Sequence, residues 1–177
     1  MQNETIIAGF GGQGVLFTGK VMAYAALESG LEVTWFPSYG PEMRGGTANC
    51  TVVISDEEIG SPQVSQPHAA IVMNQPSLDK YENLVKPGGY LAVNTSLTNR
   101  PVKRDDINVI EIPASEMAEE LGNIRFANIV ILGALAQKAD FLDMKSIEKG
   151  IAKGLEGKKS KLLDANLAAL KKGASLQ

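Results

Sequence analysis

The chain has 177 residues, of which 44% are hydrophobic and 21% charged, so it is long enough and apolar enough to fold around a core of ordinary size. Its formal net charge of −3 gives no reason to expect nucleic acid or an anionic membrane as a partner. A single cysteine, Cys50, excludes an internal disulfide and also a cysteine-ligated iron–sulfur cluster or zinc site made by this chain alone.

The first part of the chain alternates between strand and helix signals and contains two glycine-rich interruptions. A β-rich run over 5–8 is followed by glycines and then by apolar and small residues at helical spacing over 15–27. Strands are predicted at 31–36 and 47–55, and the segment 37–46 between them is an irregular loop with two prolines and three glycines. Because no helix separates these two strands, we expect strict alternation to break there.

Beyond this region the alternation continues. Strands are predicted at 69–74, 90–94 and 108–113. Helices are predicted at 77–84, 114–121, 127–139, 143–154 and 160–171. Strands that alternate with helices favour an α/β fold with a mostly parallel sheet and helices on both faces. No apolar stretch is long enough to span a bilayer, and the initial MQNET lacks the basic region of a signal peptide, so a cytoplasmic location is expected.

The first interruption is a glycine motif between a strand and a helix. Gly9, Gly11 and Gly14 fit the pattern G-x-G-x-x-G. Glycines let the backbone turn tightly and let a phosphate approach, and the free N–H groups at the start of the helix face that anion. A tight turn without a ligand would explain the same glycines, so the motif leaves both interpretations open. The polar amide of Gln13 favours contact with a ligand or a partner over simple packing.

Two common nucleotide motifs fit this stretch poorly. A dinucleotide site also needs an acidic residue about 20 residues further on, to bind a ribose hydroxyl. Here the second strand ends in the letters WFPS, and Glu42 follows only after a proline, which disfavours NAD. Residues 14–21 almost fit the P-loop pattern, but Val21 lacks the hydroxyl that would hold magnesium, and the intervening residues resemble the interior of a helix. We therefore reject the P-loop interpretation.

The second interruption is expected at the same edge of the sheet, because both loops follow the carboxyl ends of strands that would be parallel. In it, Arg44 precedes Gly45 and Gly46. A guanidinium beside a backbone that can approach closely is well suited to bind an anion. An exposed arginine with structural glycines is the alternative, and the residues alone do not decide between the two.

These two loops carry a resemblance to a known family. The stretches that carry it are GFGGQGV (9–15), WFPSYGPEMRGGTANCTVVIS (35–55), IGSP (59–62) and NIVILGAL (128–135). They resemble the gamma subunit of 2-oxoacid:ferredoxin oxidoreductases, in the 2-oxoglutarate or branched-chain form rather than the pyruvate form. The resemblance implies a single-domain, Rossmann-like three-layer sandwich over residues 1–177. It also implies a multi-subunit enzyme that oxidatively decarboxylates a 2-oxoacid, forms acyl-coenzyme A and passes electrons to ferredoxin.

The resemblance further implies a division of labour between subunits. Thiamine diphosphate, magnesium and iron–sulfur clusters would be held by alpha, beta and, where present, ferredoxin-like delta subunits, so this chain is expected to be inactive alone and to contribute no catalytic residue and no metal ligand. An apolar interface near the second loop is expected, through which the isolated chain would self-associate. The phosphate-bearing part of coenzyme A would meet Gly9, Gly11, Gly12, Gln13 and Gly14. The active-site cavity would be bordered by Arg44, Gly45, Gly46 and Thr47.

Two other functions stay open on the residues alone, namely a stand-alone regulatory module that binds a nucleotide and an NAD(P)-dependent reductase. The missing acidic residue and the lack of an obvious proton donor weaken the reductase hypothesis. Cys50 is interpreted as a small buried residue of a strand. His68, the only histidine, is interpreted as a loop residue at the start of a strand.

Overall fold

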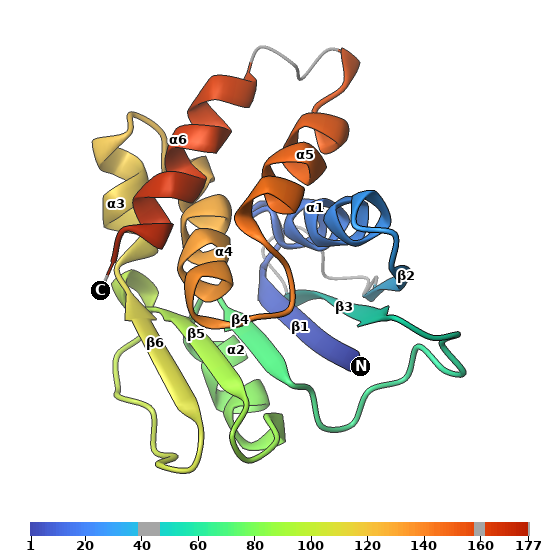
Figure 1. Cartoon of the computed structure of the whole chain (residues 1–177). Coiled ribbons are helices and arrows are strands. Elements are labelled where there is room, and N and C mark those ends of the chain that lie inside the picture. Colours follow the sequence, from blue (N-terminus) through green and yellow to red (C-terminus); the bar gives the residue numbers. More distant parts are fainter. Residues whose placement is uncertain (39–46, 158–161, 177) are drawn as a thin grey trace.

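The computed structural model describes residues 1–38, 47–157 and 162–176, whose centre is a six-stranded sheet with the order β2-β3-β1-β4-β5-β6 (Figure 1). The strands are β1 (Gln2–Phe10), β2 (Glu32–Ser38), β3 (Thr47–Ser55), β4 (Ala69–Val72), β5 (Tyr90–Asn94) and β6 (Asn108–Ile112). Strands β1, β4, β5 and β6 are parallel, whereas β3 lies antiparallel between β1 and β2. The mostly parallel α/β sheet is therefore confirmed, and its alternation breaks where the sequence predicts.

Burial explains the composition of the strands. All four residues of β4, AAIV, are buried because the strand is central and covered on both faces. Strands β2 and β6 form the two edges and are largely exposed or half-buried. Pro37 lies on the edge strand β2, where its missing N–H removes no bond to a second neighbour.

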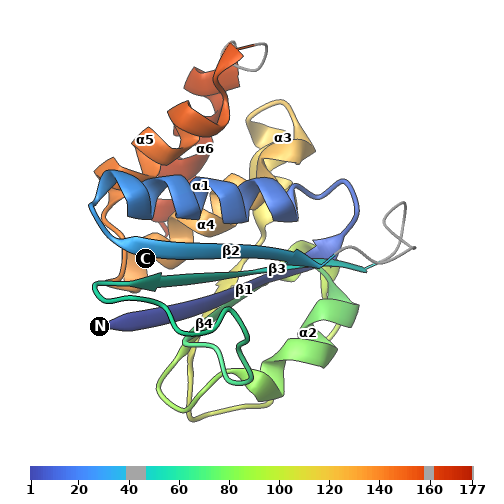
Figure 2. The same ribbon diagram turned by 90° about the vertical axis from the view of Figure 1, so that its right-hand side faces the viewer.

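The helices are divided unequally between the two faces of the sheet (Figure 2). One face carries α1 (Val15–Glu28), α3 (Ala114–Glu120), α4 (Ala127–Lys138), α5 (Met144–Gly154) and α6 (Leu163–Ala174), and the other carries α2 (Gln75–Tyr81). Short 3₁₀ turns lie at Glu82–Leu84, Thr95–Leu97 and Ile124–Phe126. Helix α4 lies beneath α6, and every residue from Ala127 to Leu135 is buried, so the apolar NIVILGAL stretch forms part of the main core. Within the described residues, no helix is long and apolar enough to cross a membrane.

Several predicted boundaries were wrong, and two of them have a reason in local chemistry or pairing. Strand β1 begins at Gln2 rather than at residue 5, because it pairs with β3 along its whole length. Helix α2 begins at Gln75 because Asn74 caps it, and it ends in a 3₁₀ turn. The last helix begins at Leu163, three residues later than the predicted start.

The connection from β1 to α1 depends on left-handed glycines and on a contact from α4. Gly12 and Gly14 have φ angles of 94° and 75°, and Gly14 is the residue that precedes the first turn of α1. The carbonyl oxygen of Gly14 accepts hydrogen bonds from the Thr18 N–H at 2.9 Å and from Asn128 Nδ2 at 3.2 Å. Asn128 is 4% exposed, so α4 fixes the start of α1 from inside the core.

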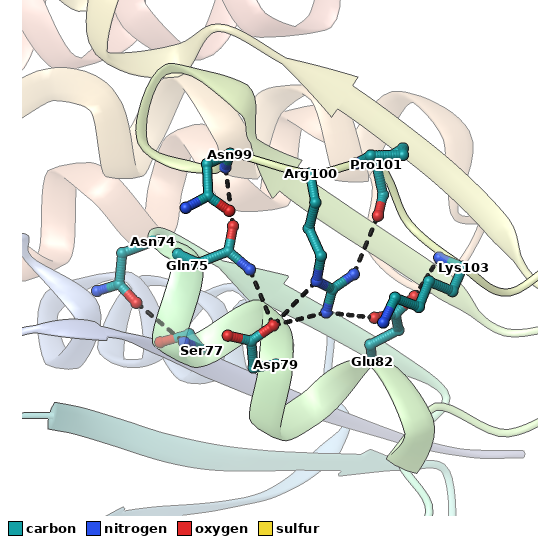
Figure 3. A network of polar contacts seen from close by, with 9 residues as sticks. All are labelled: Asn74, Gln75, Ser77, Asp79, Glu82, Asn99, Arg100, Pro101 and Lys103. Carbon is teal, nitrogen blue, oxygen red and sulfur yellow. Dashed lines mark hydrogen bonds and ion pairs between the residues drawn. The ribbon is translucent and has the colours of Figure 1, made fainter.

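The opposite face is held together by a buried ion pair (Figure 3). Arg100 Nη2 lies 2.7 Å from Glu82 Oε2 and 2.7 Å from Asp79 Oδ1, and the Lys103 N–H also donates to Glu82. The Glu82 side chain is only 3% exposed. Burial raises the pKa of Glu82, but hydrogen bonds from Lys103 and Arg100 outweigh it, and the pKa falls below its ordinary value of 4.5. These contacts attach the segment before β6 to α2.

We expect the two left-handed glycines to respond differently to alanine. Gly12→Ala adds a Cβ with no heavy atom within 4 Å, so only the backbone is penalised, by about 1 kcal/mol of unfolding free energy. Gly14→Ala carries the same penalty and also places a Cβ 2.4 Å from Asn128 Nδ2, which should cost about 1 to 3 kcal/mol more. Urea unfolding of the two variants measures the difference. Equal losses would contradict the close contact between Gly14 and α4.

Arg100→Ala should lower the free energy of unfolding by about 3 kcal/mol, because it leaves the buried Glu82 carboxylate without its partner. Arg125→Ala, at an exposed arginine, should cost less than about 0.5 kcal/mol and serves as the control.

Because folding lowers the pKa of Glu82, the contribution of this carboxylate to the stability of the fold is present above pH 4.5 and is lost as the pH falls through the folded-state pKa. In Arg100→Ala the pKa of Glu82 in the folded state should move back towards its unfolded value, so the stability that is lost on acidification should be smaller than in the wild type. Urea titrations at several pH values measure it, and an unchanged acid response would argue against the ion pair.

Candidate functional site

The strands that lead into the two loops singled out by the sequence end at the same edge of the sheet. Phe10 at the end of β1 pairs with Thr47, and Ser38 at the end of β2 pairs with Asn49, so β1 and β2 both end beside the start of β3, which lies between them. Among the predicted site residues, Arg44, Gly45 and Gly46 lie outside the described residues. Thr47 is described, is exposed and lies beside the strand that leads into the glycine loop.

Gln13 closes the glycine loop with its own side chain. Its Oε1 accepts a hydrogen bond from the Phe10 N–H at 2.6 Å and a second from Asn74 Nδ2 at 3.1 Å. Its backbone N–H donates to the Phe10 carbonyl at 3.2 Å. Within the described part of the chain, Gln13 Nε2 makes no hydrogen bond. The carbonyl end of the amide therefore belongs to the fold, and the end left for a ligand is a donor.

The glycines of the motif are needed at their positions for different structural reasons. A Cβ on Gly9 would lie 2.6 Å from Gln13 Oε1 and 2.9 Å from Met73 Cβ, so Gly9 makes room for the inward-facing amide oxygen. Gly12 and Gly14 are required by their φ angles. Among the described residues, no heavy atom lies within 4 Å of a Cβ built on Gly12, so they leave the outer side of the loop open.

The start of α1 adds donors to the same place. No side chain among the described residues caps α1, and the first N–H groups of a helix have no partner within it. These amides carry the positive end of the helix dipole and attract an anion. A hollow of about 260 Å³ lies alongside. It is lined by Phe10, Gly11, Gly12, Gly14, Val15, Leu16, Phe17 and Ala48. The arrangement suits a ligand that carries an anionic group next to a less polar chain.

Three asparagines that the sequence analysis did not single out support this edge. Asn74, 1% exposed, follows β4 and accepts a hydrogen bond from the Ser77 N–H at 3.0 Å, which caps α2. Asn94 is the last residue of β5, is fully buried and donates to the Met73 carbonyl at 3.2 Å. Asn128 reaches Gly14 from α4. An asparagine between a buried strand and a proline is a helix-cap signal, so Asn74 was detectable as a cap, although not as a partner of Gln13.

The structure also argues against the P-loop and dinucleotide motifs that the sequence disfavours. Residues 15–21, which contain most of the P-loop-like pattern, form the first half of α1 rather than a loop. Gly19 serves packing there, because a Cβ on it would lie 2.5 Å from Cys50 Sγ. Strand β3 separates β1 from β2, and β2 ends in Ser38 without an acidic residue, so the ribose contact of a dinucleotide site is missing at that position.

Cys50 and His68 both serve the fold. Cys50 is fully buried in β3, and burial raises the pKa of its thiol to about 12, so it stays protonated near neutral pH. His68 directly precedes β4, and its Nδ1 pairs with the Glu4 carboxylate. Because β4 starts opposite Thr5, His68 lies at the amino edge of the sheet, away from the glycine loop. No cluster of potential metal ligands occurs among the described residues.

Known proteins with related sequences and structures match nearly the whole chain. The ketoisovalerate oxidoreductase subunit VorA of Methanothermobacter marburgensis is 43% identical over 169 residues, which cover 95% of this chain and 35% of VorA. The 2-oxoglutarate synthase subunit KorC of Methanocaldococcus jannaschii is 37% identical over 180 residues, covering 98% of this chain and 92% of KorC. The structure of 2-oxoglutarate:ferredoxin oxidoreductase from Magnetococcus marinus, with 2-oxoglutarate, coenzyme A and succinyl-CoA bound, matches with a TM-score of 0.88 and 26% identity, over 98% of this chain and 30% of that one.

The size of these relatives differs. This chain spans only 35% of the length of the VorA proteins, whereas it spans nearly all of KorC. The sequence profile of pyruvate ferredoxin/flavodoxin oxidoreductases matches residues 4–176. Since that match includes both glycine-rich loops and the buried α4, it confirms the resemblance on which the sequence analysis relied, and the chain belongs to the pyruvate ferredoxin/flavodoxin oxidoreductase family.

Proposed function

We propose that this chain is the gamma-type component of a 2-oxoacid:ferredoxin oxidoreductase and that its glycine loop helps to bind coenzyme A. The enzyme as a whole would oxidatively decarboxylate a 2-oxoacid, transfer the acyl group to coenzyme A and pass the electrons to ferredoxin. Thiamine diphosphate, magnesium and iron–sulfur clusters, held by partner subunits, would supply the bond cleavage and the electron transfer. Of the possible substrates, 2-oxoglutarate and 2-oxoisovalerate are favoured.

The observation that carries this proposal is the set of free donors at the carboxyl edge of β1. The start of α1 and Gln13 Nε2 offer N–H groups beside an apolar hollow, and the described residues that line this hollow carry no negative charge. Coenzyme A combines phosphate groups with a long, less polar arm, so it matches this combination of donors and apolar wall. The match of a related enzyme that has coenzyme A bound supports the same ligand.

The role of the chain would be to position this ligand. Gly9, Gly11, Gly12, Gln13 and Gly14 would hold the phosphate-bearing part, while Arg44, Gly45, Gly46 and Thr47 would border the chamber in which the acyl group is transferred. Holding the thiol-bearing arm in one orientation converts an encounter between two molecules into a reaction within one complex, which can supply several kcal/mol of the barrier reduction. No proton transfer or bond cleavage is assigned to this chain.

Partner subunits would cover the apolar side chains near this edge. Phe36 on β2 is 59% exposed and Phe10 at the end of β1 is 36% exposed. Exposed aromatic residues close to a binding edge favour an interface with alpha and beta subunits and, where present, a ferredoxin-like delta subunit. In the isolated chain the same residues would favour self-association.

In the complex purified with its partner subunits, Gln13→Ala and Arg44→Ala should each raise the KM for coenzyme A about tenfold, the effect of losing one charge-assisted hydrogen bond. The affinity for thiamine diphosphate should stay unchanged. Steady-state kinetics with varied coenzyme A measures the first effect, and titration of the cofactor-depleted complex measures the second. Gln137→Ala, at an exposed glutamine in the last turn of α4, is the matched control.

Three outcomes would overturn the proposal. Wild-type KM values in both variants would remove the coenzyme A assignment. Turnover of a 2-oxoacid by the purified chain alone would contradict the division of labour. Purification of the natural protein without larger, iron–sulfur-containing chains would favour the stand-alone regulatory module instead.

A further inference from the structure

The orientation of the Gln13 amide is determined by two backbone N–H groups, which can only donate. The Ser77 N–H donates to Asn74 Oδ1 at 3.0 Å (Figure 3), so the other end of the Asn74 amide, Nδ2, must be the group that meets Gln13. The Phe10 N–H donates to Gln13 Oε1 at 2.6 Å. The Phe10 N–H and Asn74 Nδ2 therefore converge on the same oxygen, and Nε2 is the end of the Gln13 amide that has no partner among the residues the structure describes.

The reversed orientation of Gln13 is unfavourable. It would place Nε2 against the Phe10 N–H and against Asn74 Nδ2, and both bonds to Oε1 would be lost. Since Asn74 is 1% exposed, its Nδ2 group would then be buried without a partner, so the orientation with Oε1 facing inward is the favoured one.

We propose that Asn74 is a positioning residue: it orients the Gln13 amide so that the glycine loop presents a hydrogen-bond donor to an anionic group of the ligand. This inference rests on the proposed function, because it takes coenzyme A as that ligand. Asn74 lies just beyond the end of β4, on the side of β1 away from β3. It also caps α2, which lies on the face of the sheet opposite to α1. The start of α2 and the glycine loop are thus joined by one side chain.

Asn74→Asp separates the two roles of this side chain. The introduced carboxylate still accepts a hydrogen bond from the Ser77 N–H, so the cap of α2 is kept, but it cannot donate to Gln13 Oε1. It attracts Gln13 Nε2 instead, which turns the amide and takes the acceptor away from the Phe10 N–H. In the isolated chain, hydrogen exchange of the Phe10 amide should become at least tenfold faster.

The same variant in the assembled complex should show a raised KM for coenzyme A. We expect an increase of about tenfold with kcat changed less than about twofold, since the donor is lost but no reacting group is touched. Calorimetric titration of the complex with coenzyme A should show the matching loss of affinity. Asn123→Asp is the matched control, because Asn123 also accepts a backbone N–H, that of Arg125 at 3.0 Å, and is exposed. It should leave Phe10 exchange and both kinetic constants at wild-type values.

Gln13→Glu tests the proposal without altering Asn74. A carboxylate accepts from both the Phe10 N–H and Asn74 Nδ2, so the Phe10 amide should stay protected, while a negative oxygen replaces the outward donor. The KM for coenzyme A should therefore rise more than in Gln13→Ala. If Asn74→Asp does not assemble with its partners, this variant decides the question.

The results also separate this inference from the function it rests on. A raised KM in Gln13→Ala together with wild-type Phe10 exchange and wild-type KM in Asn74→Asp would overturn the role of Asn74 and leave the coenzyme A site intact. Faster Phe10 exchange in Asn74→Asp with an unchanged KM, in parallel with an unchanged KM in Gln13→Ala, would overturn the site itself. Loss of Phe10 protection or an unchanged KM in Gln13→Glu would contradict the proposed orientation of the amide.

Discussion

The pairing of β3 with both β1 and β2 is the constraint on which the candidate site depends. Its nine residues pair with β1 from Ser55 opposite Gln2 to Thr47 opposite Phe10, and seven of them pair with β2 on the other side. This antiparallel strand keeps β1 and β2 parallel to one another although they do not touch. As a result, the glycine loop, the end of β2 and the start of β3 come to one edge, and the place where a dinucleotide-binding sheet has its second strand is occupied by β3.

The glycine loop is held from three directions, and each contact leaves its outer surface free. Gln13 closes the loop within itself, Asn74 reaches it from the end of β4, and Asn128 reaches Gly14 from α4. All three are short amide side chains whose carbonyl or amino groups are matched by a specific partner. These contacts hold the N–H donors of the loop in place before a ligand binds, which lowers the conformational entropy that is lost on binding.

The two faces of the sheet achieve stability in different ways. The face with five helices buries a continuous apolar core, to which α4 contributes an unbroken run of buried residues. The face with α2 has a smaller apolar cluster and depends in addition on the buried pair of Glu82 and Arg100. Because Asn74 joins α2 to the glycine loop, the stability of this thinner layer bears directly on the geometry of the site.

Local sequence patterns determined most of the elements: the glycine-rich turn between β1 and α1, the buried strands, the helical periods and the break in alternation before β3. These features depend on backbone conformation and side-chain spacing over a few residues, which the order of amino acids specifies directly. Only the tertiary structure decided that β3 lies between β1 and β2, that the oxygen of Gln13 faces inward, and that Asn74 and Asn128 hold the loop. Those contacts join residues 61 and 114 positions apart, and such partners are selected by packing and by the need to pair buried polar groups, which no local pattern records.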